Sequence, residues 1–355
     1  MISAARIFNF GLPEGAFSGH QSGVTKLNVI SDCHPDEKYV SLYECSHVYR
    51  TAWSWTLMRE YDIDVWRRDR RICCPPPGNR LPSTDFCGQS PLVPRIVGGS
   101  DARPHEFPWM AMLLYLNRSS LEILPLCAGS LINNRYVVTS AHCVVGVPDD
   151  LSLKSVRLGE HDITYNPAYD PNCRDQARRC ALPNLEIGVE KIIVHGRFNS
   201  SFSGRIQNDI ALLRLKMPVR YSTGIQPICV QNPDPFTISR FEIAGWGITN
   251  NGSLSQVLQR GVIWEKELRV CAERIPFLAF NVHSQICAGG DGGVDTCSAD
   301  SGGPLMATVG RMDNTRVYLA GITSYGTRKC GTIGWPGVYT KTSAFLGWIK
   351  WLLRP

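Results

Sequence analysis

The stretch Asp295-Thr-Cys-Ser-Ala-Asp-Ser-Gly-Gly-Pro304 holds the densest group of chemically useful side chains in this 355-residue chain. It contains a candidate nucleophile, Ser301, directly after Asp300, and a further acid, Asp295, six residues before the serine. A lone serine hydroxyl is a poor nucleophile, because it needs a base within hydrogen-bonding reach and a third group that orients the base. A histidine and another acid elsewhere in the chain must supply these two groups.

His142 and Asp209 are the candidates for the base and its orienting group. His142 lies in Thr139-Ser-Ala-His-Cys143. Asp209 lies in Asn208-Asp-Ile-Ala-Leu-Leu-Arg214, before an apolar run that predicts a buried strand. Each residue taken alone is more often a satisfied polar group than a catalytic one. The three contexts in the order His142, Asp209, Ser301 favour catalysis.

These motifs resemble the active-site segments of the trypsin and chymotrypsin family of serine proteases. Arg95-Ile-Val-Gly-Gly99 and Ser324-Tyr-Gly326 carry the same resemblance. The resemblance implies an all-β fold of two six-stranded antiparallel barrels, with the catalytic residues in the cleft between them. It also implies that Ser301 attacks the substrate carbonyl, His142 transfers the proton and Asp209 orients the imidazole.

The resemblance further implies how substrate is bound. The backbone amides of Ala299 and Ser301 are the expected oxyanion hole. The residues expected to bind the substrate are Asp295, Ser324, Gly326 and Gly337. Asp295 corresponds to the acid at the base of the specificity pocket, and an unpaired buried carboxylate favours a substrate that brings a cation. We therefore expect cleavage after Arg or Lys.

The bond between Arg95 and Ile96 is the expected activation site. By the same resemblance, the new ammonium group of Ile96 inserts beside Asp300, and a buried pair of this kind selects one conformation over another. The uncut chain is then a zymogen. Its activator is expected to be trypsin-like, because the bond follows an arginine, which places the chain inside a proteolytic cascade.

Fourteen cysteines predict seven disulfides, an oxidising compartment and secretion. The net charge of +6 is spread out, and its one dense run, Arg67-Arg-Asp-Arg-Arg71, is expected to be a solvated surface, with partner docking as the alternative. We expect no nucleic-acid partner. No apolar run approaches the roughly 20 residues of a membrane span, so we expect no membrane partner.

The N-terminal residues do not support the secretion that the cysteines indicate, because Met1 to Ile30 contain no continuous apolar segment typical of a signal peptide. We give the cysteines the greater weight and expect a start that is truncated or misassigned. Residues 1–32 are expected to be a flexible segment.

Residues 33–74 form a predicted disulfide module, and residues 75–95 form a Pro- and Gly-rich linker that ends at the activation site. The module resembles the clip domain that precedes the protease in many arthropod proteases. Val40-Ser-Leu-Tyr-Glu-Cys45 and Ile72-Cys-Cys-Pro75 carry this resemblance. The clip domain usually has six cysteines and this module has four. A disulfide-tied propeptide without a binding role is the alternative. Residues 96–355 form the expected protease domain.

The resemblance implies most of the cysteine pairing. The implied disulfides are Cys33–Cys73, Cys45–Cys74, Cys87–Cys229, Cys127–Cys143, Cys271–Cys287 and Cys297–Cys330. This leaves Cys173 and Cys180, which are close enough in the sequence to close a short loop.

Glu160, Asp162 and Asp170 fall at the spacing of the family's calcium loop, so the resemblance implies a structural Ca²⁺ site, with solvated acids as the alternative. No cofactor is expected for catalysis. The N-glycosylation sequons begin at Asn117, Asn199 and Asn251.

Short apolar runs bounded by Gly, Pro or Asn predict the strands of an all-β domain. The expected strands include residues 107–115, 129–139, 191–194, 210–215, 241–246 and 317–324. The one expected helix covers Ala344 to Leu353, where apolar residues recur at helical spacing.

We expect a secreted zymogen endopeptidase that acts on a downstream zymogen or a cytokine precursor in arthropod innate immunity, in melanisation, clotting or Toll-ligand processing. A serpin-type inhibitor is an expected partner, and a venom protease is a variant of this hypothesis. The alternative is a catalytically weak or inactive homologue that binds and regulates. Ala299 keeps this alternative open because the family has glycine there, whereas the complete set of His142, Asp209 and Ser301 favours an enzyme.

Overall fold

The computed structural model describes residues 33, 36–49, 71–89, 99–165, 184–201, 205–230, 239–248, 252–274, 280–292, 296–297, 299–310, 315–326 and 331–355. All of these residues belong to one compact unit, Cys33–Pro355. The flexible segment expected at residues 1–32 lies outside the described residues.

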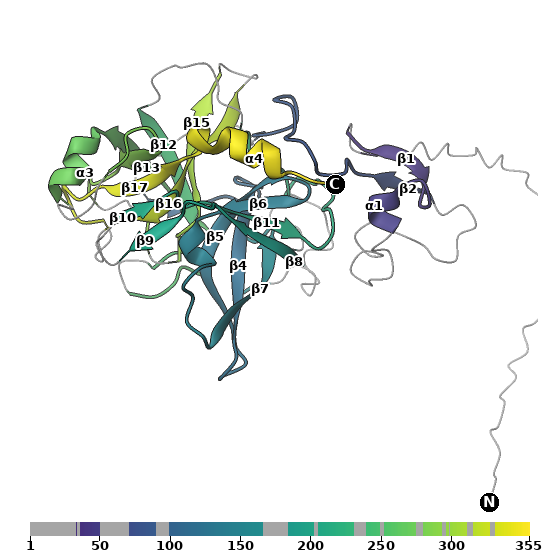
Figure 1. Ribbon diagram of the computed structural model, residues 1–355, viewed down its shortest axis with the longest axis horizontal. Coiled ribbons are helices and arrows are strands. Elements are labelled where there is room, and N and C mark those ends of the chain that lie inside the picture. Colours follow the sequence, from purple (N-terminus) through teal and green to yellow (C-terminus); the bar gives the residue numbers. More distant parts are fainter. Residues whose placement is uncertain are drawn as a thin grey trace, which may run out of the picture. The chain divides into compact units, whose positions relative to one another are not determined.

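One barrel consists of six antiparallel strands that close on themselves (Figure 1). Its strands are β4 (Met110–Asn117), β5 (Ile123–Asn133), β6 (Tyr136–Thr139), β7 (Leu151–Leu158), β8 (Leu185–Val194) and β11 (Ala211–Leu215). Their hydrogen-bonding order is β11-β6-β5-β4-β7-β8, and β8 pairs back with β11. Met110 to Tyr115 are all buried, which explains the continuous apolar run of β4.

The second barrel also has six strands. They are β12 (Arg240–Gly245), β13 (Gln259–Lys266), β14 (Gln285–Ala288), β15 (Pro304–Val309), β16 (Arg316–Tyr325) and β17 (Gly337–Lys341). Their order is β12-β15-β16-β17-β14-β13, and the pairing of β13 with β12 closes the barrel. The short strand β3 (Ser100–Asp101) pairs with β13. The prediction of two six-stranded antiparallel barrels is confirmed.

Outside the barrels, β9 (Asn199–Ser201) and β10 (Arg205–Gln207) form a hairpin. This hairpin directly precedes Asn208 and Asp209 in the chain. The hairpin is therefore followed directly by the candidate orienting acid and then by β11.

Contacts between the two barrels fix the loop that carries Ser301. Trp109, which precedes β4, is fully buried, and its indole Nε1 donates to Sδ of Met306 on β15 at 3.2 Å. The backbone amide of Ala128 on β5 donates to the carbonyl of Ser301 at 2.8 Å. The first barrel therefore holds a loop that belongs to the second.

The helices of the described residues are short. They are α1 (Ser46–Tyr49), α3 (Leu268–Arg274) and α4 (Leu346–Leu352), with 3₁₀ turns η1 (Ala141–Cys143) and η5 (Thr342–Phe345). The predicted C-terminal helix is present as η5 followed by α4, but the expectation of a single helix is wrong. Cys271 is the buried residue of α3, and Leu268 packs against it. The seven residues of α3 are too few for helical periodicity to be recognised in the sequence. None of the described helices is long and apolar enough to cross a membrane.

The expected strand at residues 129–139 is in fact the end of β5, a tight turn and β6. Oδ1 of Asn133 accepts the backbone amides of Arg135 at 2.9 Å and Tyr136 at 2.8 Å. Asparagine turns the chain in this way because its side chain replaces a backbone acceptor. The turn therefore interrupts a run that its apolar residues alone predict to be continuous.

The N-terminal module has a two-stranded sheet and two disulfides. β1 (Lys38–Ser41) pairs with β2 (Arg71–Cys74). The predicted disulfides Cys33–Cys73 and Cys45–Cys74 are present. Leu42, Val48 and Ile72 are buried. The four-cysteine module thus combines its disulfides with a small apolar core.

Two asparagines at the β5–β6 turn hold the linker. Their side-chain amides donate to three linker carbonyls. The acceptors are Gly78 at 2.8 Å and Arg80 at 3.0 Å for Asn133, and Pro76 at 2.6 Å for Asn134. A Cβ added at Gly78 would lie 2.4 Å from Cβ of Arg135, so this close approach requires glycine. The predicted disulfide Cys87–Cys229 also ties the linker to the protease domain.

Ile349 on α4 is fully buried in the core. We expect Ile349→Ala to lower the free energy of unfolding by about 2–5 kcal/mol, because it removes packed methyl groups and leaves a cavity. Lys350→Ala, at the exposed neighbouring position, should change it by no more than about 0.5 kcal/mol. Denaturant unfolding measures both, and equal losses would contradict the packing of α4.

Candidate active site

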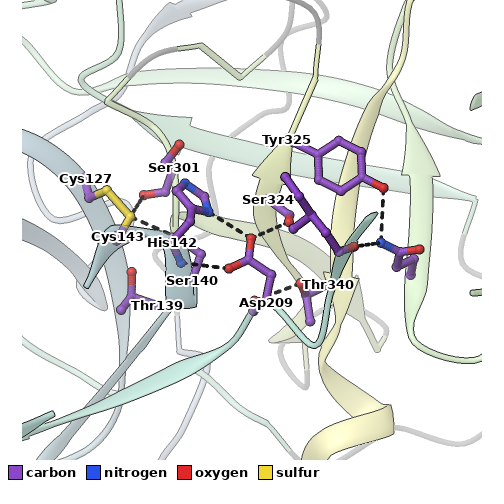
Figure 2. A network of polar contacts seen from close by, with 12 residues as sticks. Cys127, Thr139, Ser140, His142, Cys143, Asp209, Ser301, Ser324, Tyr325 and Thr340 are labelled. Carbon is purple, nitrogen blue, oxygen red and sulfur yellow. Dashed lines mark hydrogen bonds and ion pairs between the residues drawn. A yellow bond between two sulfur atoms is a disulfide. The ribbon is translucent and has the colours of Figure 1, made fainter. Parts of the chain in front are cut away.

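His142 and Asp209 lie at the same end of the first barrel. His142 belongs to η1, shortly after β6, and Asp209 lies shortly before β11, which pairs with β6. Nδ1 of His142 is 2.8 Å from Oδ2 of Asp209, and the His142 backbone amide donates to Oδ1 at 3.0 Å (Figure 2). An ionised carboxylate only accepts hydrogen bonds, so Nδ1 carries the proton and Nε2 is left to accept one.

The side chain of Asp209 is enclosed by both barrels. Asp209 is 1% exposed. The hydroxyl of Ser324 on β16 donates to Oδ2, and the hydroxyl of Thr340 on β17 donates to the Asp209 backbone carbonyl at 2.9 Å. A buried charge is tolerated only where donors replace its hydration. Asp209 therefore lies in the first barrel, and the second barrel supplies hydroxyl groups that donate hydrogen bonds to it.

Ser301 lies in the turn that leads into β15. The next residue, Gly302, has φ 79°, and a Cβ added there would lie 2.1 Å from Oγ1 of Thr139. Figure 2 shows Ser301 on the side of the His142 ring away from Asp209. Within the described residues, the Ser301 hydroxyl makes no hydrogen bond with this ring, a looseness that is common before substrate binds. The three side chains are nonetheless brought together in the predicted order.

Ala299 has a left-handed backbone conformation, with φ 76°. The turn around it is held by the Asp300 amide, which donates to the Cys297 carbonyl, and by the Gly303 amide, which donates to the Asp300 carbonyl, both at 2.9 Å. Among the residues that the structure describes, no protein acceptor takes the backbone amides of Ala299 and Ser301. Both amides can therefore donate to an oxygen of a bound substrate.

The carboxylate of Asp300 is 8% exposed and lies against a glycine pair. It accepts the backbone amides of Gly247 at 2.8 Å and Cys297 at 2.9 Å. A Cβ at Gly245 would lie 1.9 Å from its Oδ1, and one at Gly247 would lie 2.2 Å from its Oδ2. Arg95 and Ile96 lie outside the described residues, so the activation contact with Asp300 stays a prediction.

Two of the expected pocket residues lie side by side. A Cβ built on Gly326 would lie 3.7 Å from Cα of Gly337, so the two backbones are in close approach and neither residue projects a side chain. Oγ1 of Thr296 is 3.2 Å from the hydroxyl of Tyr339, which lies close to Gly337. Asp295 lies outside the described residues, and its place at the base of the pocket stays a prediction.

The cysteines of the described residues are all in disulfides. The predicted bonds Cys127–Cys143 and Cys271–Cys287 are present. Cys297 is disulfide-bonded. Its predicted partner Cys330 lies outside the described residues, as do Cys173 and Cys180.

The expected calcium ligand Glu160 is already bound by protein donors. Its carboxylate accepts Nη1 of Arg157 at 3.2 Å, Nδ2 of Asn184 at 2.9 Å and the backbone amide of His161 at 2.9 Å. Burial raises the pKa of Glu160, although these bonds and the Arg157 charge oppose the shift. Arg157 also bonds to Glu186, its cross-strand neighbour, at 3.3 Å. A guanidinium group thus stands where the calcium charge was expected.

The remaining expected calcium ligands do not change this result. Oδ1 of Asp162 accepts the backbone amide and the hydroxyl of Thr164 at 2.9 and 2.6 Å, and Asp170 lies outside the described residues. Calcium needs several free oxygens at once. The described part of the loop does not fit the ion, whereas the expected site as a whole, which includes Asp170, stays a prediction.

The sequons lie at different kinds of position. Asn117 ends β4, and its Oδ1 accepts the backbone amides of Ser119 and Ser120 at 2.9 and 3.1 Å. Asn199 is exposed on β9, and Asn251 lies outside the described residues. Glycosylation of all three stays a prediction.

Two residues near Asp209 could not be predicted from the sequence. Thr340 bonds to its carbonyl, and Gln285, which pairs with Thr340 in the β14–β17 register, bonds to the neighbouring Tyr325. Neither residue belongs to a motif. Only the long-range strand register, which the sequence does not show, brings them to the site.

The fold and the site define a serine protease of two β-barrels. The family described as Trypsin matches residues 96–349. Neuropsin, a serine protease expressed in the limbic system of mouse brain, has a solved structure with a TM-score of 0.55 and 31% identity, covering 72% of this chain and 98% of its own. The chain belongs to the trypsin family of serine proteases.

Curated relatives extend the match beyond the protease domain to insect proteins. The Spaetzle-processing enzyme of Drosophila melanogaster is 42% identical over 293 residues, which cover 78% of this chain and 71% of that protein. CLIP domain-containing serine protease B9 of Anopheles gambiae is 39% identical over 277 residues, which cover 76% and 65%. The resemblance to clip-domain serine proteases is confirmed.

The Arg157 contacts predict a protease whose stability does not depend on calcium. A bound ion at one hundred times its Kd would add about 2.7 kcal/mol, so the Tm should be the same in millimolar Ca²⁺ and in EDTA. Arg157→Gln should cost about 3 kcal/mol, because it removes the charged partner of the buried Glu160 carboxylate.

The control for Arg157→Gln is Arg269→Gln, which removes an exposed ion pair and should have an effect within about 1 kcal/mol. Thermal unfolding of both variants and the parent protein gives the comparison. A calcium-dependent rise of Tm in the parent that Glu160→Gln abolishes would overturn the conclusion about this loop.

Proposed function

We propose that the chain is a secreted zymogen endopeptidase with trypsin-like specificity, which is activated by cleavage after Arg95 and then processes a precursor protein in an arthropod innate-immune cascade. The observation that carries the proposal is the buried Asp209 carboxylate bonded to His142, with Ser301 on the other side of the ring. A buried acid in this position orients an imidazole for proton transfer from a hydroxyl.

In the proposed reaction, Oγ of Ser301 attacks the carbonyl carbon of the peptide bond while Nε2 of His142 takes the hydroxyl proton. Asp209 keeps the ring oriented and stabilises its positive charge. The amides of Ala299 and Ser301 bind the carbonyl oxygen as it becomes negative. His142 then protonates the leaving amine, and a water molecule repeats the attack and releases the acyl group from the serine.

The proposed specificity rests on Asp295 at the base of a pocket with glycine walls. Gly326 and Gly337 lie side by side in the wall of the proposed pocket, and a long cationic side chain can pass along them because neither carries a side chain. The carboxylate then pairs with the cation that the substrate brings, and a neutral side chain leaves it unpaired at a cost. This favours Arg and Lys over Phe.

Activation is proposed to occur at Arg95. The freed ammonium group of Ile96 would join the backbone amides of Gly247 and Cys297 around the Asp300 carboxylate. A trypsin-like activator is the proposed upstream partner, and a serpin-type inhibitor is proposed to regulate the activated protease. Disulfides throughout the described residues support an extracellular location.

The class of substrate is proposed from the insect relatives. The name of the Drosophila relative describes the processing of Spaetzle. We infer a substrate of the same kind, a precursor whose cleavage releases an active protein, with a downstream zymogen of melanisation or clotting as the alternative. A venom protease would keep the same chemistry and change the target.

Cleavage after Arg95 followed by assays on Arg-, Lys- and Phe-ended peptides tests this function. We expect activity on the Arg and Lys substrates only after cleavage, from two chains that Cys87–Cys229 joins on a non-reducing gel. Asp295→Asn should lower this activity on the order of 10²-fold or more, whereas Asp291→Asn should not. Cleavage of the Phe substrate alone would overturn the proposed specificity.

A catalytically weak homologue is the second candidate, and the left-handed Ala299 favours it. Alanine keeps its backbone amide, so the oxyanion donor survives chemically. Its Cβ destabilises the left-handed turn by roughly 1–2 kcal/mol relative to glycine. Withdrawal of the donor would cost on the order of 10²–10³ in kcat. We therefore infer a working enzyme in which only a fraction of molecules hold the competent turn.

Ala299→Gly in the activated protease should raise kcat about five- to thirtyfold with little change in KM, because 1.4 kcal/mol corresponds to tenfold in a population or a rate. Ala320→Gly on β16 is the control, and it should lower stability by about 0.5–1 kcal/mol without raising kcat. An unchanged kcat would show that Ala299 is harmless. Absence of activity in both forms would favour the non-catalytic homologue.

A further inference from the structure

A buried glutamine on β14 joins two chain segments beside the active site. Gln285 is 5% exposed. Its Nε2 donates to the hydroxyl of Tyr325 at 3.2 Å and to the backbone carbonyl of Ile206 at 3.1 Å. Its Oε1 accepts the backbone amide of Asn281 at 2.8 Å. Both N–H groups and the oxygen are therefore used, and the orientation of the amide is fixed.

Two of the three partners of Gln285, Ile206 and Tyr325, lie close to Asp209 along the chain or in space. Ile206, on β10, comes three residues before Asp209. Tyr325 directly follows Ser324, whose hydroxyl bonds to the Asp209 carboxylate (Figure 2). Burial raises the pKa of Tyr325 to about 12, so its phenol stays protonated and able to bond at neutral pH.

Within the described residues, Tyr325 also lies where one edge of β16 is not paired with another strand. On its β15 side, β16 makes backbone hydrogen bonds as far as Thr323, whereas on the other side its pairing with β17 continues to Tyr325. An extended peptide can add to such an edge as a strand. The next residue, Gly326, lies beside Gly337 in the wall of the proposed specificity pocket.

These positions determine where a substrate chain must run. A substrate whose residue before the cut bond enters the pocket along Gly326 and Gly337 has its earlier residues beside the end of β16. Tyr325 lies there, and Ile206 is tied to it through the shared amide of Gln285. The two residues come from different segments, so their spacing depends on the group that joins them.

We propose that Gln285 is a positioning residue for extended substrates, because it ties Tyr325 to Ile206 and so fixes the wall that the substrate residues before the cleaved position contact. Gln285 itself does not touch the reacting atoms. The proposal rests on the proposed function only in the choice of a substrate that ends in arginine.

Gln285→Met tests this role, because methionine keeps the length of the side chain and removes both N–H donors. The activated protease is assayed on a single-residue arginine amide and on a tetrapeptide arginine amide with the same leaving group. We expect kcat/KM for the tetrapeptide to fall about tenfold, mainly through KM, as for the loss of one or two hydrogen bonds. The single-residue substrate should lose less than about twofold.

Two further variants separate this role from a general loss of structure. Tyr325→Phe removes one shared partner, so the double variant with Gln285→Met should match Gln285→Met alone within about twofold, since contacting residues are not additive. Gln259→Met is the control. Gln259 on β13 also bonds to a side chain and a carbonyl, those of Asp101 and Val257, and its loss should leave the ratio of the two substrates unchanged.

Equal losses on the two substrates would overturn the proposal, because they would mean that Gln285 acts through Asp209 or through stability. The absence of any loss on either substrate would overturn it as well. If the parent protease cuts a Phe-ended pair of substrates and not the arginine pair, the proposed specificity fails. The same ratio measured on the Phe-ended pair then still decides the role of Gln285.

Discussion

The buried carboxylate of Asp209 is the interaction on which the rest of the site depends. Asp209 enters from the first barrel with His142, but the hydroxyls that complete its environment, Ser324 and Thr340, come from the second. A buried carboxylate without hydrogen-bond donors would be costly. Correct packing of the two barrels supplies the donors that Asp209 needs, and the site therefore forms only when the whole domain is folded.

The geometry of the loop that carries Ser301 depends on glycines, because the absence of a Cβ lets the backbone lie close to its neighbours. Gly302 passes so close to Thr139 that a Cβ has no room, and Gly245 and Gly247 leave space for the Asp300 carboxylate. These contacts set the backbone directly, without the rotamer freedom of longer side chains. Ala299 is the exception, because a Cβ occupies a left-handed position in the same loop. The loop thus combines a backbone fixed by close contacts with one strained residue, two positions before the nucleophile.

The catalytic residues could be predicted from the sequence because each lies in a short, distinctive motif, and the barrels followed from their resemblance to a family. Features that depend on strand register could not. Glu160 has the spacing of a calcium ligand, but the β7–β8 register and its own β7 neighbour give it Arg157 instead. Gln285 reaches the site only through its pairing with Thr340. The helix α3 could not be predicted because its seven residues are too few for apolar periodicity to be recognised.

The attachment of the linker to Asn133 and Asn134 has a consequence for how the protease meets large partners. The linker carbonyls are held by side-chain amides, and Cys87 is bonded to Cys229, so the module would stay tethered to the catalytic domain after the proposed cleavage. A partner that binds the module would then be confined near the catalytic domain, at the millimolar effective concentrations typical of short tethers. Such a partner could be cleaved efficiently even if its cleavage sequence binds weakly, so avidity would contribute to the selectivity of the proposed protease.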